Sequence, residues 1–390
     1  MHAPDSRRAP RARGTGTLTV EVCSDERAFA DLGPAWRRLQ DAGRRATPFQ
    51  SHAWLHSWWL SYGRPGRLRL FLVRRGGDLL AAAPMMRTTA PLPALVPLGG
   101  GITDFNDVLL HEEAVEEAAT ALARALGDAA RTALVDFGEV RPGSAVEEVY
   151  RRWRGPRRRL PDSACLELPP APMGDLMARL PANRAQRVRN KLNKIGKLGI
   201  SWQAVAPEET ADSLRRMLEL HRLQWEGRGV SPEHVRPRFA EHLVRSVVPM
   251  ARTGEALVRE YRLEGETVAV DLTLLSPRLA GVYLYGVHPR LRERKADVAT
   301  MVLQAAAEQA AGGHSAALSL LRGDEPYKYR WRPETVVNER LLLARRRTAP
   351  LLAAALAEAA ARSRAKALLR RRAQARAPQA NENHRRADAG

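Results

Sequence analysis

Apolar and polar residues alternate along the chain in two long stretches, and each stretch predicts strands, a hairpin and helices. The first stretch opens at Leu18–Val22, where the two kinds of side chain alternate as in a half-buried strand. Ser51 is a suitable N-cap for a tryptophan-rich helix. In order, the predicted elements are a strand at 18–22, helices at 29–39 and from 51, a hairpin at 68–85, a strand at 107–110, a helix at 113–126 and a strand at 133–137.

The second stretch follows a basic helix at 174–197 that Pro181 interrupts. Ser231-Pro232 is typical of a helix start, because serine caps well and proline is favoured in the first turn. The predicted elements are a strand at 200–205, helices at 214–224 and from 231, a hairpin at 256–275, a strand at 282–287, a helix at 298–311, a strand at 316–321, a short helix near 326 and a strand at 337–344. This is the order of the first stretch.

The two hairpins share a sequence pattern. Arg74–Ala82 and Arg262–Val270 both read R-x-x-G-[DE]-x-[LV]-A-[AV]. A glycine beside an acid is a common hairpin turn, so the pattern gains its weight from lying at the same step of two parallel series of elements. We therefore expect a duplicated α/β domain.

The length of 390 residues also favours two domains, because it exceeds the size at which one hydrophobic core stops growing. Beyond Arg370 the chain is rich in Arg, Gln, Asn and Ala without an apolar period, which is typical of disorder. The expected division is a disordered basic N-terminus at 1–16, a first domain at 17–170, a basic linking helix at 171–199, a second domain at 200–345, and a helix-prone, then disordered basic tail at 346–390.

The net charge of +20 suggests a nucleic-acid partner, but much of it lies at the ends of the chain. Residues 344–390 hold twelve basic residues against three acids, so we expect a solvated tail and no specific nucleic-acid site. Two cysteines, Cys23 and Cys165, are too few for a disulfide framework or a cysteine-only zinc site, and no metal is expected. Without a membrane span or an apolar leader, the expectation is a soluble cytoplasmic protein.

The most distinctive segment is Leu321–Trp331, which reads LRGDEPYKYRW directly after an apolar strand. It combines a glycine turn, two acids, two tyrosines, a tryptophan and three basic residues. A structural loop rarely needs so many large polar aromatic residues, because each buried hydroxyl or indole N–H must find a partner. The segment therefore indicates a functional site.

This segment resembles the L-x-G-D-E-x-Y-K-x-x-W motif of the GNAT-type acetyltransferase domain in CelD-like (cellulose-biosynthesis-like) bacterial proteins. The resemblance covers roughly residues 17–345, with the terminal motif as its specific part. Four weaker pieces agree in order: Pro48-Phe49-Gln50-Ser51 before Trp54, Thr103-Asp104-Phe105-Asn106-Asp107, Leu220–Trp225 and Tyr283–Gly286. It implies two tandem GNAT-like mixed-sheet α/β domains, related to the FemABX aminoacyl transferases.

The resemblance also implies an acyl-CoA, in the simplest case acetyl-CoA, bound by the second domain. GNAT folds hold the pyrophosphate on free backbone N–H groups where a helix begins, because those donors and the helix dipole favour an anion. Here that helix starts near 298. Asp297 departs from the small residues usual at this turn and would place a carboxylate where a phosphate is expected. The implied cofactor-binding residues are Tyr285, Gly286, Val287, Arg292, Arg294, Lys295, Ala296, Val298 and Ala299.

Catalysis requires an amine to lose a proton and a thiolate to gain one. His221 lies four residues before Trp225 and shares a helix face with it, so it is either a base or a hydrogen-bonded core residue. Asp324 and Glu325 are alternative bases, unless they only cap the short helix at 326. Tyr327 could protonate the departing sulfur or simply pack.

The acceptor is expected in a cleft between the domains. The first domain lacks a basic loop before its helix at 113, so we expect a degenerate copy that binds no CoA and shapes this cleft. Trp54, Trp58 and Trp59 are expected in its core. The predicted substrate-binding residues are Asp104, Asp107, Trp225, Lys328 and Trp331.

The leading hypothesis is N-acyl transfer from acyl-CoA to an amine on a small molecule, sugar or envelope precursor. A FemABX-like transferase using aminoacyl-tRNA is the first alternative, and the basic helix at 184–197 could then contact RNA. A non-catalytic GNAT-fold binding protein is the second, for which Asp297 is the best argument. The sequence leaves the oligomeric state open.

Overall fold

A computed structural model describes residues 16–226, 231–313, 315–323 and 325–387, with side chains as far as residue 369 except 366. Residues 1–15 of the expected disordered N-terminus at 1–16 lie outside these residues. The first half comprises β1 (Leu18–Cys23), α1 (Glu26–Asp31), α2 (Gly33–Ala42), η1 (Pro48–Gln50), α3 (His52–Tyr62), β2 (Leu68–Arg75), β3 (Asp78–Thr88), β4 (Ala94–Pro97), β5 (Leu109–Leu110), η2 (Glu112–Ala114), α4 (Val115–Ala129), β6 (Leu134–Val140), α5 (Val146–Arg152) and β7 (Arg157–Leu168).

The second half repeats the arrangement. It comprises α6 (Met173–Ala178), α7 (Ala182–Lys197), β8 (Ser201–Ala204), α8 (Thr210–Trp225), α9 (Pro237–Arg252), β9 (Ala256–Leu263), β10 (Glu266–Leu275), β11 (Ala280–Val287), α10 (Arg290–Glu293), α11 (Val298–Gly312), β12 (Leu318–Arg322), η3 (Lys328–Trp331), β13 (Glu334–Leu343), η4 (Arg346–Thr348) and α12 (Ala349–Ala387).

The described strands form one 13-stranded sheet in the order β1-β2-β3-β4-β6-β13-β7-β12-β11-β10-β9-β8, with β5 beside β3. The order is nearly symmetric, since β1-β2-β3-β4-β6 on one side corresponds to β8-β9-β10-β11-β12 on the other. Each side has one parallel pair at the same step. Ala94 of β4 pairs with Leu134 of β6, and Ala280 of β11 pairs with Leu318 of β12. The duplication expected from the two hairpins is therefore present in the topology.

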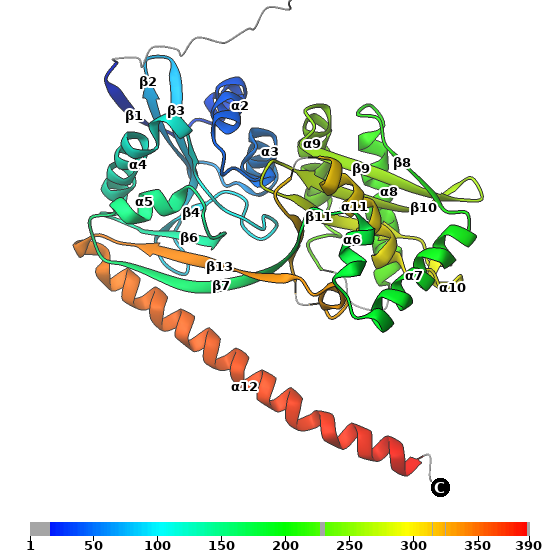
Figure 1. Ribbon diagram of the computed structural model, residues 1–390. Helices are drawn as coiled ribbons and strands as arrows, with labels where there is room; N and C mark the ends of the chain where they lie inside the picture. Colours follow the sequence, from blue (N-terminus) through cyan, green and yellow to red (C-terminus); the bar gives the residue numbers. More distant parts are fainter. Residues whose placement is uncertain (1–15, 227–230, 314, 324, 388–390) are drawn as a thin grey trace, which may run out of the picture.

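The last strand of each half completes the sheet of the other half. β7 pairs antiparallel with β12, and β13 pairs antiparallel with β6. The two exchanged strands also pair with each other along most of their length, and Figure 1 shows them side by side between the halves. Because of this exchange, the two halves share one continuous sheet.

Helices cover both faces of the sheet. Along β2, Leu70 and Leu72 belong to one core while Phe71 and Val73 belong to another, as the two-residue period of a strand requires. The first core includes side chains of α3 from the first half and α8 and α9 from the second, so it spans the junction. Trp54, Trp58 and Trp59 are buried in it, as expected.

Some elements begin or end elsewhere than the sequence predicts. The helix expected from Ser231 starts at Pro237, and residues 232–235 form a turn before it. The proline rule still holds, because Pro237 occupies the first helical position. α12 continues to Ala387, past Arg370, where we expected disorder; Ala, Arg and Gln are all good helix formers.

α12 leaves the body of the molecule soon after it starts. Leu352 and Ala355 are buried against β4, β6 and β13, and the rest of the helix extends away from the sheet (Figure 1). Across the residues that the structure describes, no helix combines the length and apolar character needed to cross a membrane.

Candidate functional site

A cavity opens where β11 and β12 separate. These parallel strands pair only at their first residues, up to Gly281 and Ser319. A register shift against β7 and a left-handed backbone at Leu321 (φ 55°) then turn β12 away. The resulting cavity of about 800 Å³ lies between the two halves. Its walls are residues 282–285 and 320–323, side chains of α8 and α11, the turn before α9, the residues Glu325, Tyr327, Lys328 and Trp331, and Gly101, Ile102, Asp104 and Ser163 of the first half.

A groove of about 680 Å³ lies on the other side of β11's end. It is lined by Val287, residues 288–289, 292 and 295–299, and by Lys191 and Arg330. Three residues, Gln224, Ala299 and Tyr327, line both the groove and the cavity. We call this place, where the three residues border both spaces, the junction.

The junction is polar and half-buried. The Tyr285 and Tyr327 side chains are hydrogen-bonded to each other, and Gln224 is hydrogen-bonded to Tyr285. Burial raises the pKa of both tyrosines, so their hydroxyls stay protonated at neutral pH. Within the described residues, Oε1 of Gln224 is buried without a hydrogen-bond partner. It is therefore a ready acceptor for an N–H group of a ligand.

Asp297 caps α11 at the edge of the groove, as its sequence position suggests. Its Oδ1 accepts the Thr300 N–H at 3.0 Å, and its Oδ2 accepts the Lys191 ammonium. Arg330 lies 3.8 Å from the same oxygen. Burial opposes ionisation, yet the Lys191 and Thr300 hydrogen bonds hold the pKa of Asp297 below its usual value. The carboxylate is therefore charged and neutralised by a cation from α7.

The basic residues of α10 and of the turn after it divide into two groups. Arg292 and Lys295 line the groove. Arg294 instead contacts Glu264 at 3.2 Å, and Arg290 contacts Glu264 and Glu266 in the β9–β10 turn. Among the predicted cofactor residues, Ala296, Val298, Ala299 and Val287 also line the groove, whereas Arg294 lies outside its lining.

Gly286 serves packing. A Cβ atom at this position would lie 2.0 Å from the Met217 carbonyl oxygen and 2.6 Å from the backbone nitrogen of His221. Helix α8 therefore packs directly on the β11 backbone. That close approach brings His221 of α8 to Tyr285, the neighbour of Gly286. The predicted cofactor residue Gly286 thus lies against a helix, while Tyr285 faces the cavity.

His221 is buried in the cavity wall and has partners on both ring nitrogens. Nδ1 lies 2.9 Å from the Tyr285 carbonyl oxygen, and Nε2 lies 3.2 Å from Nδ1 of His234. Burial lowers the pKa of His221, so the ring is neutral at pH 7. Trp225 shares its helix face, with ring centroids 6.3 Å apart, and also lines the cavity.

The 321–331 segment places four predicted residues around the cavity: Glu325, Tyr327, Lys328 and Trp331. Lys328 is buried and donates to the Arg322 carbonyl oxygen at 2.9 Å and to Glu325 at 2.8 Å. Trp331 packs into the apolar core under α11. Asp324, a predicted alternative base, lies outside the described residues.

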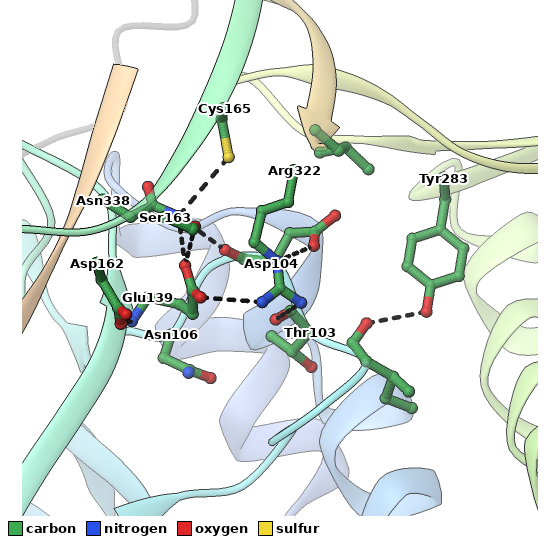
Figure 2. Close-up of polar contacts among 12 residues, drawn as sticks. Thr103, Asp104, Asn106, Glu139, Asp162, Ser163, Cys165, Tyr283, Arg322 and Asn338 are labelled. Carbon is green, nitrogen blue, oxygen red and sulfur yellow. Dashed lines mark hydrogen bonds and ion pairs between the residues drawn. The ribbon is translucent and has the colours of Figure 1, made fainter. Parts of the chain in front are cut away.

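Asp104 belongs to an ion-pair network at the boundary between the halves (Figure 2). Nε of Arg322 donates to the Asp104 carboxylate, and its NH1 donates to Glu139 at 3.0 Å. Nδ2 of Asn338 donates to Glu139 at 2.9 Å and to the Asp104 carbonyl at 3.2 Å. Burial raises the pKa of Asp104, although Arg322 opposes this. The network connects β6, β12 and β13 to the loop that carries Asp104.

Backbone irregularities bring these side chains together. Glu139 has a left-handed backbone (φ 55°), and the pairing of β13 shifts register on both sides near Asn338. Bulges of this kind re-aim side chains and recur beside functional sites. Ser163 donates to Glu139 within this network, and it lines the cavity together with Asp104 and Arg322.

Asp107 lies away from the cavity. Its carboxylate accepts the N–H groups of Val108, Ala145 and Val146 at 2.8, 2.8 and 2.7 Å, which fixes the start of α5. The structure therefore gives this predicted substrate-binding residue a structural role, because a buried carboxylate without a cation needs several N–H donors.

The equivalent of α11 in the first half is α4. Four acids, Glu112, Glu113, Glu116 and Glu117, occupy its start and the turn before it. A phosphate would be repelled there, which fits the expectation that the first half binds no CoA.

The comparison with known families also distinguishes the two halves. Residues 182–329, from α7 to η3, match the family described as Acetyltransferase (GNAT) domain. Over these residues, the second half of the chain is similar to a GNAT acetyltransferase domain. It contains the groove, the junction and one wall of the cavity. No curated protein sequence matches this chain.

Solved structures share the fold of about four-fifths of the chain. A conserved protein of unknown function from Bacteroides thetaiotaomicron has 13% identity and a TM-score of 0.56, over 84% of this chain and 100% of that one. FemX has 11% identity and a TM-score of 0.56, over 79% and 95%. The C-terminal domain of a putative lysylphosphatidylglycerol synthetase from Agrobacterium fabrum has 10% identity and a TM-score of 0.53, over 80% and 92%. The predicted fold class is thereby confirmed.

Sequence reasoning missed several residues of the site, chiefly His234, Gln224, Arg322 and Glu139. Gln224 and Arg322 lie inside segments that were singled out, next to Trp225 and Asp324. In the sequence, His234 could have been selected only as a histidine in a polar turn, and no sequence feature distinguishes Glu139. Within the described residues, no group of three or more His, Cys, Asp or Glu side chains is arranged to hold a metal ion.

Proposed function

We propose that the protein transfers an acyl group, in the simplest case acetyl, from acyl-CoA to an amine of a small molecule, sugar or envelope precursor. The observation that carries the proposal is the junction, where the groove of the GNAT domain meets a cavity built by both halves. A donor held in the groove would present its thioester to an acceptor held in the cavity. On the 321–331 motif, we further propose membership of the CelD-like group.

The charge of the groove supports a phosphate-bearing donor. Lys191, Arg292, Lys295 and Arg330 line it, against the single acid Asp297. Four cations around one carboxylate leave an excess of positive charge, so Asp297 reduces the attraction for a phosphate without reversing it. The unpartnered Gln224 Oε1 would accept an amide N–H of the pantetheine arm at the junction.

Transfer proceeds by direct attack. The amine nitrogen bonds to the thioester carbonyl carbon, the C–S bond breaks, one proton leaves nitrogen and one reaches sulfur. Tyr327 is suited to protonate the sulfur, because burial keeps its hydroxyl protonated at the junction. Asp104, Trp225 and Lys328 are the proposed acceptor-side residues, since all three line the cavity.

Calorimetric titration with acetyl-CoA tests the donor assignment. Arg292→Ala removes a cation from the groove, and we expect its Kd to rise about 5-fold, equivalent to roughly 1 kcal/mol. Arg290→Ala is the matched control, two residues away and bound to Glu264 and Glu266 instead. Failure of the wild type to bind acetyl-CoA, or equal weakening in both variants, would remove the donor assignment.

Aminoacyl-tRNA is the second candidate donor, for one specific reason. α7 brings Lys191 to the groove and exposes Arg184, Arg187, Arg189, Lys194 and Lys197 along the rest of its length. A helix with several exposed cations beside a donor groove suits an RNA backbone. RNA binding that weakens steeply with salt, together with no response to acetyl-CoA, would favour this donor.

A further inference from the structure

Two histidine rings from different elements meet on the cavity wall. His221 lies on α8, and His234 lies on the turn before α9; both line the cavity. Nε2 of His221 and Nδ1 of His234 are 3.2 Å apart, and the other nitrogen of His221 lies 2.9 Å from the Tyr285 carbonyl oxygen. The two rings therefore form a chain of hydrogen bonds that begins at the Tyr285 carbonyl oxygen in the β11 backbone.

This chain fixes where the protons lie. A carbonyl oxygen only accepts, so Nδ1 of His221 carries the hydrogen and Nε2 of this neutral ring is an acceptor. Nδ1 of His234 must then donate to it. In a neutral His234 ring, the lone pair is consequently left on Nε2.

His234 is held in place from three sides. Its ring stacks on Phe239 of α9 with centroids 4.8 Å apart. Its backbone N–H donates to the Ser231 carbonyl at 3.0 Å. The neighbouring Glu233 is fixed by two hydrogen bonds from Arg238, at 2.8 and 2.7 Å. An imidazole held in this way loses little entropy when it acts on a substrate.

Burial keeps the His234 ring neutral. The pKa of His234 is lowered to about 4, mainly by burial and also by the nearby His221, while Glu233 opposes both. The carboxylates of the described cavity lining are engaged by cations instead: Asp104 by Arg322, Glu233 by Arg238 and Glu325 by Lys328. A neutral imidazole with a free lone pair is thus better placed than these acids to take a proton.

We propose that His234 is the general base for the acceptor amine and that His221 is a positioning residue acting through it. The inference rests on the proposed acyl transfer. Nε2 of His234 takes the proton that the nitrogen loses as the N–C bond forms. The sulfur receives its proton from Tyr327 as the C–S bond breaks; afterwards His234 releases its proton to solvent and Tyr327 regains one from solvent.

The kinetic test compares variants with acetyl-CoA and three amine probes, glucosamine, L-lysine and putrescine, by thiol release. For His234→Ala, we expect kcat to fall about 100-fold or more, with little change in KM, as for loss of a general base. Excess imidazole should restore part of that rate, which a purely structural loss would not allow. His111→Ala is the control, a histidine of the first half at the start of η2, and should keep the wild-type rate.

A spectroscopic test needs no acceptor. Long-range nitrogen–proton NMR spectra of the histidine-labelled full chain distinguish the tautomers, with His234→Asn and His221→Phe assigning the signals. We expect both rings to be neutral at pH 7 with hydrogen on Nδ1, and His221→Phe to release His234 from its single tautomer.

The outcomes separate the two proposals. A wild type that neither binds acetyl-CoA nor acylates any probe overturns the proposed function, and the spectra still decide whether the histidine chain exists. A wild type that is active, with His234→Ala retaining at least half of kcat or showing no rescue, overturns the base assignment. Hydrogen on Nε2 of His234, or an imidazolium at pH 7, overturns the proton arrangement itself.

Discussion

Asp297 performs two tasks at the start of α11. It accepts the Thr300 N–H, and it pairs with Lys191 across the groove. The first task is one that asparagine performs equally well, whereas the second needs a negative charge. Substitution at this residue therefore separates helix capping from groove electrostatics.

For Asp297→Asn, we expect acetyl-CoA to bind about 5-fold more tightly, because the cap survives while Lys191 and Arg330 become free to contact phosphate. The pKa of Asp297 is lowered in the folded protein, so its contribution to stability is present at neutral pH and is lost as the pH falls towards and below its folded pKa. Calorimetric Kd values and thermal midpoints of Asp297→Asn and Asp297→Ala measure both effects. A weaker Kd for Asp297→Asn would show that the carboxylate assists binding.

His242 gives the fold a sensitivity to acid. It is fully buried between α3 and α9, with Nδ1 3.2 Å from the Ser57 hydroxyl and its ring edge-on to Trp54. Burial lowers the pKa of His242 to about 3 from 6.5, and also lowers the pKa of His56 to about 4. In that interval the folded chain binds fewer protons than the unfolded chain, so acid favours unfolding.

Replacing His242 with Gln should flatten this dependence. We expect the free energy of unfolding of the wild type to fall as the pH drops below 6.5, and the variant to lose less, by up to about 1.4 kcal/mol per pH unit for one group. Urea unfolding across this range measures the slope. Values at about pH 7.5, where these histidines are neutral, isolate the packing cost of the substitution. If the pH dependence of the unfolding free energy were the same in the variant and the wild type, His242 would not be a source of the acid sensitivity.

At the residue scale, the sequence was informative where chemistry is concentrated in one segment. The 321–331 motif, His221 and Asp104 could be selected from their residue types. His221 and Asp104 line the cavity, as do four predicted residues of the motif: Glu325, Tyr327, Lys328 and Trp331. Asp324 lies outside the described residues. The partners could not be selected, because Arg322 meets Glu139 and Asn338 meets Asp104 only after strands far apart in sequence have paired. Asp107 carried the same local signal as Asp104 yet lies at a helix start.

At the scale of elements, the contact of α8 with β11 decides the geometry of the site. The helix approaches the strand so closely that residue 286 has no room for a side chain. The same contact sets the His221–Tyr285 hydrogen bond, and through it the orientation of His234.

Gly286→Ala should therefore affect both stability and activity. We expect a loss of about 1–3 kcal/mol or more, because the new Cβ would push α8 from the strand. Gly281→Ala is the matched control on the same strand, where the Cβ would meet ends of leucine side chains at 3.0 Å or more. Thermal midpoints and histidine spectra measure the difference. Equal midpoints for the two variants would contradict the tight contact.

Element prediction succeeded where the period was clear and failed where pairing partners decide. The β9–β10 hairpin and α11 follow their predicted residues closely. β7 was not separated as an element, because its exposed half reads RRRLPDS and only pairing with β13 makes it a strand. The start of α9 was misplaced because two proline-containing segments, at 232 and 237, carry similar signals.

At the scale of the whole molecule, the exchange of β7 and β13 makes the halves depend on each other. β12 would be left as an open edge without β7, and β13 would lose both of its partners. The sequence predicted the duplication from matching hairpins, but nothing in either half indicated that their last strands cross over.

Separate expression of the halves tests this dependence. We expect residues 171–348 alone to be insoluble or to unfold without a cooperative transition, because an unpaired interior strand edge promotes aggregation. Co-expression with residues 1–170 should recover soluble material that elutes as one complex. Solubility, circular dichroism and acetyl-CoA binding are the measurements. A fragment that folds alone and binds acetyl-CoA would contradict the prediction.

The crossed strands also constrain how such a protein can change over generations. Because each copy of the duplicated unit contains the strand that completes the sheet of the other, neither copy can be deleted. Residues of one copy that bind ligand can still be substituted while the shared sheet is kept. The two copies already differ in this way, with acids at the start of α4 and cations along the groove of the second half. Recombination that swaps acceptor specificity would have to carry both copies together, or be confined to the loop at 101–107 and the turn at 231–236.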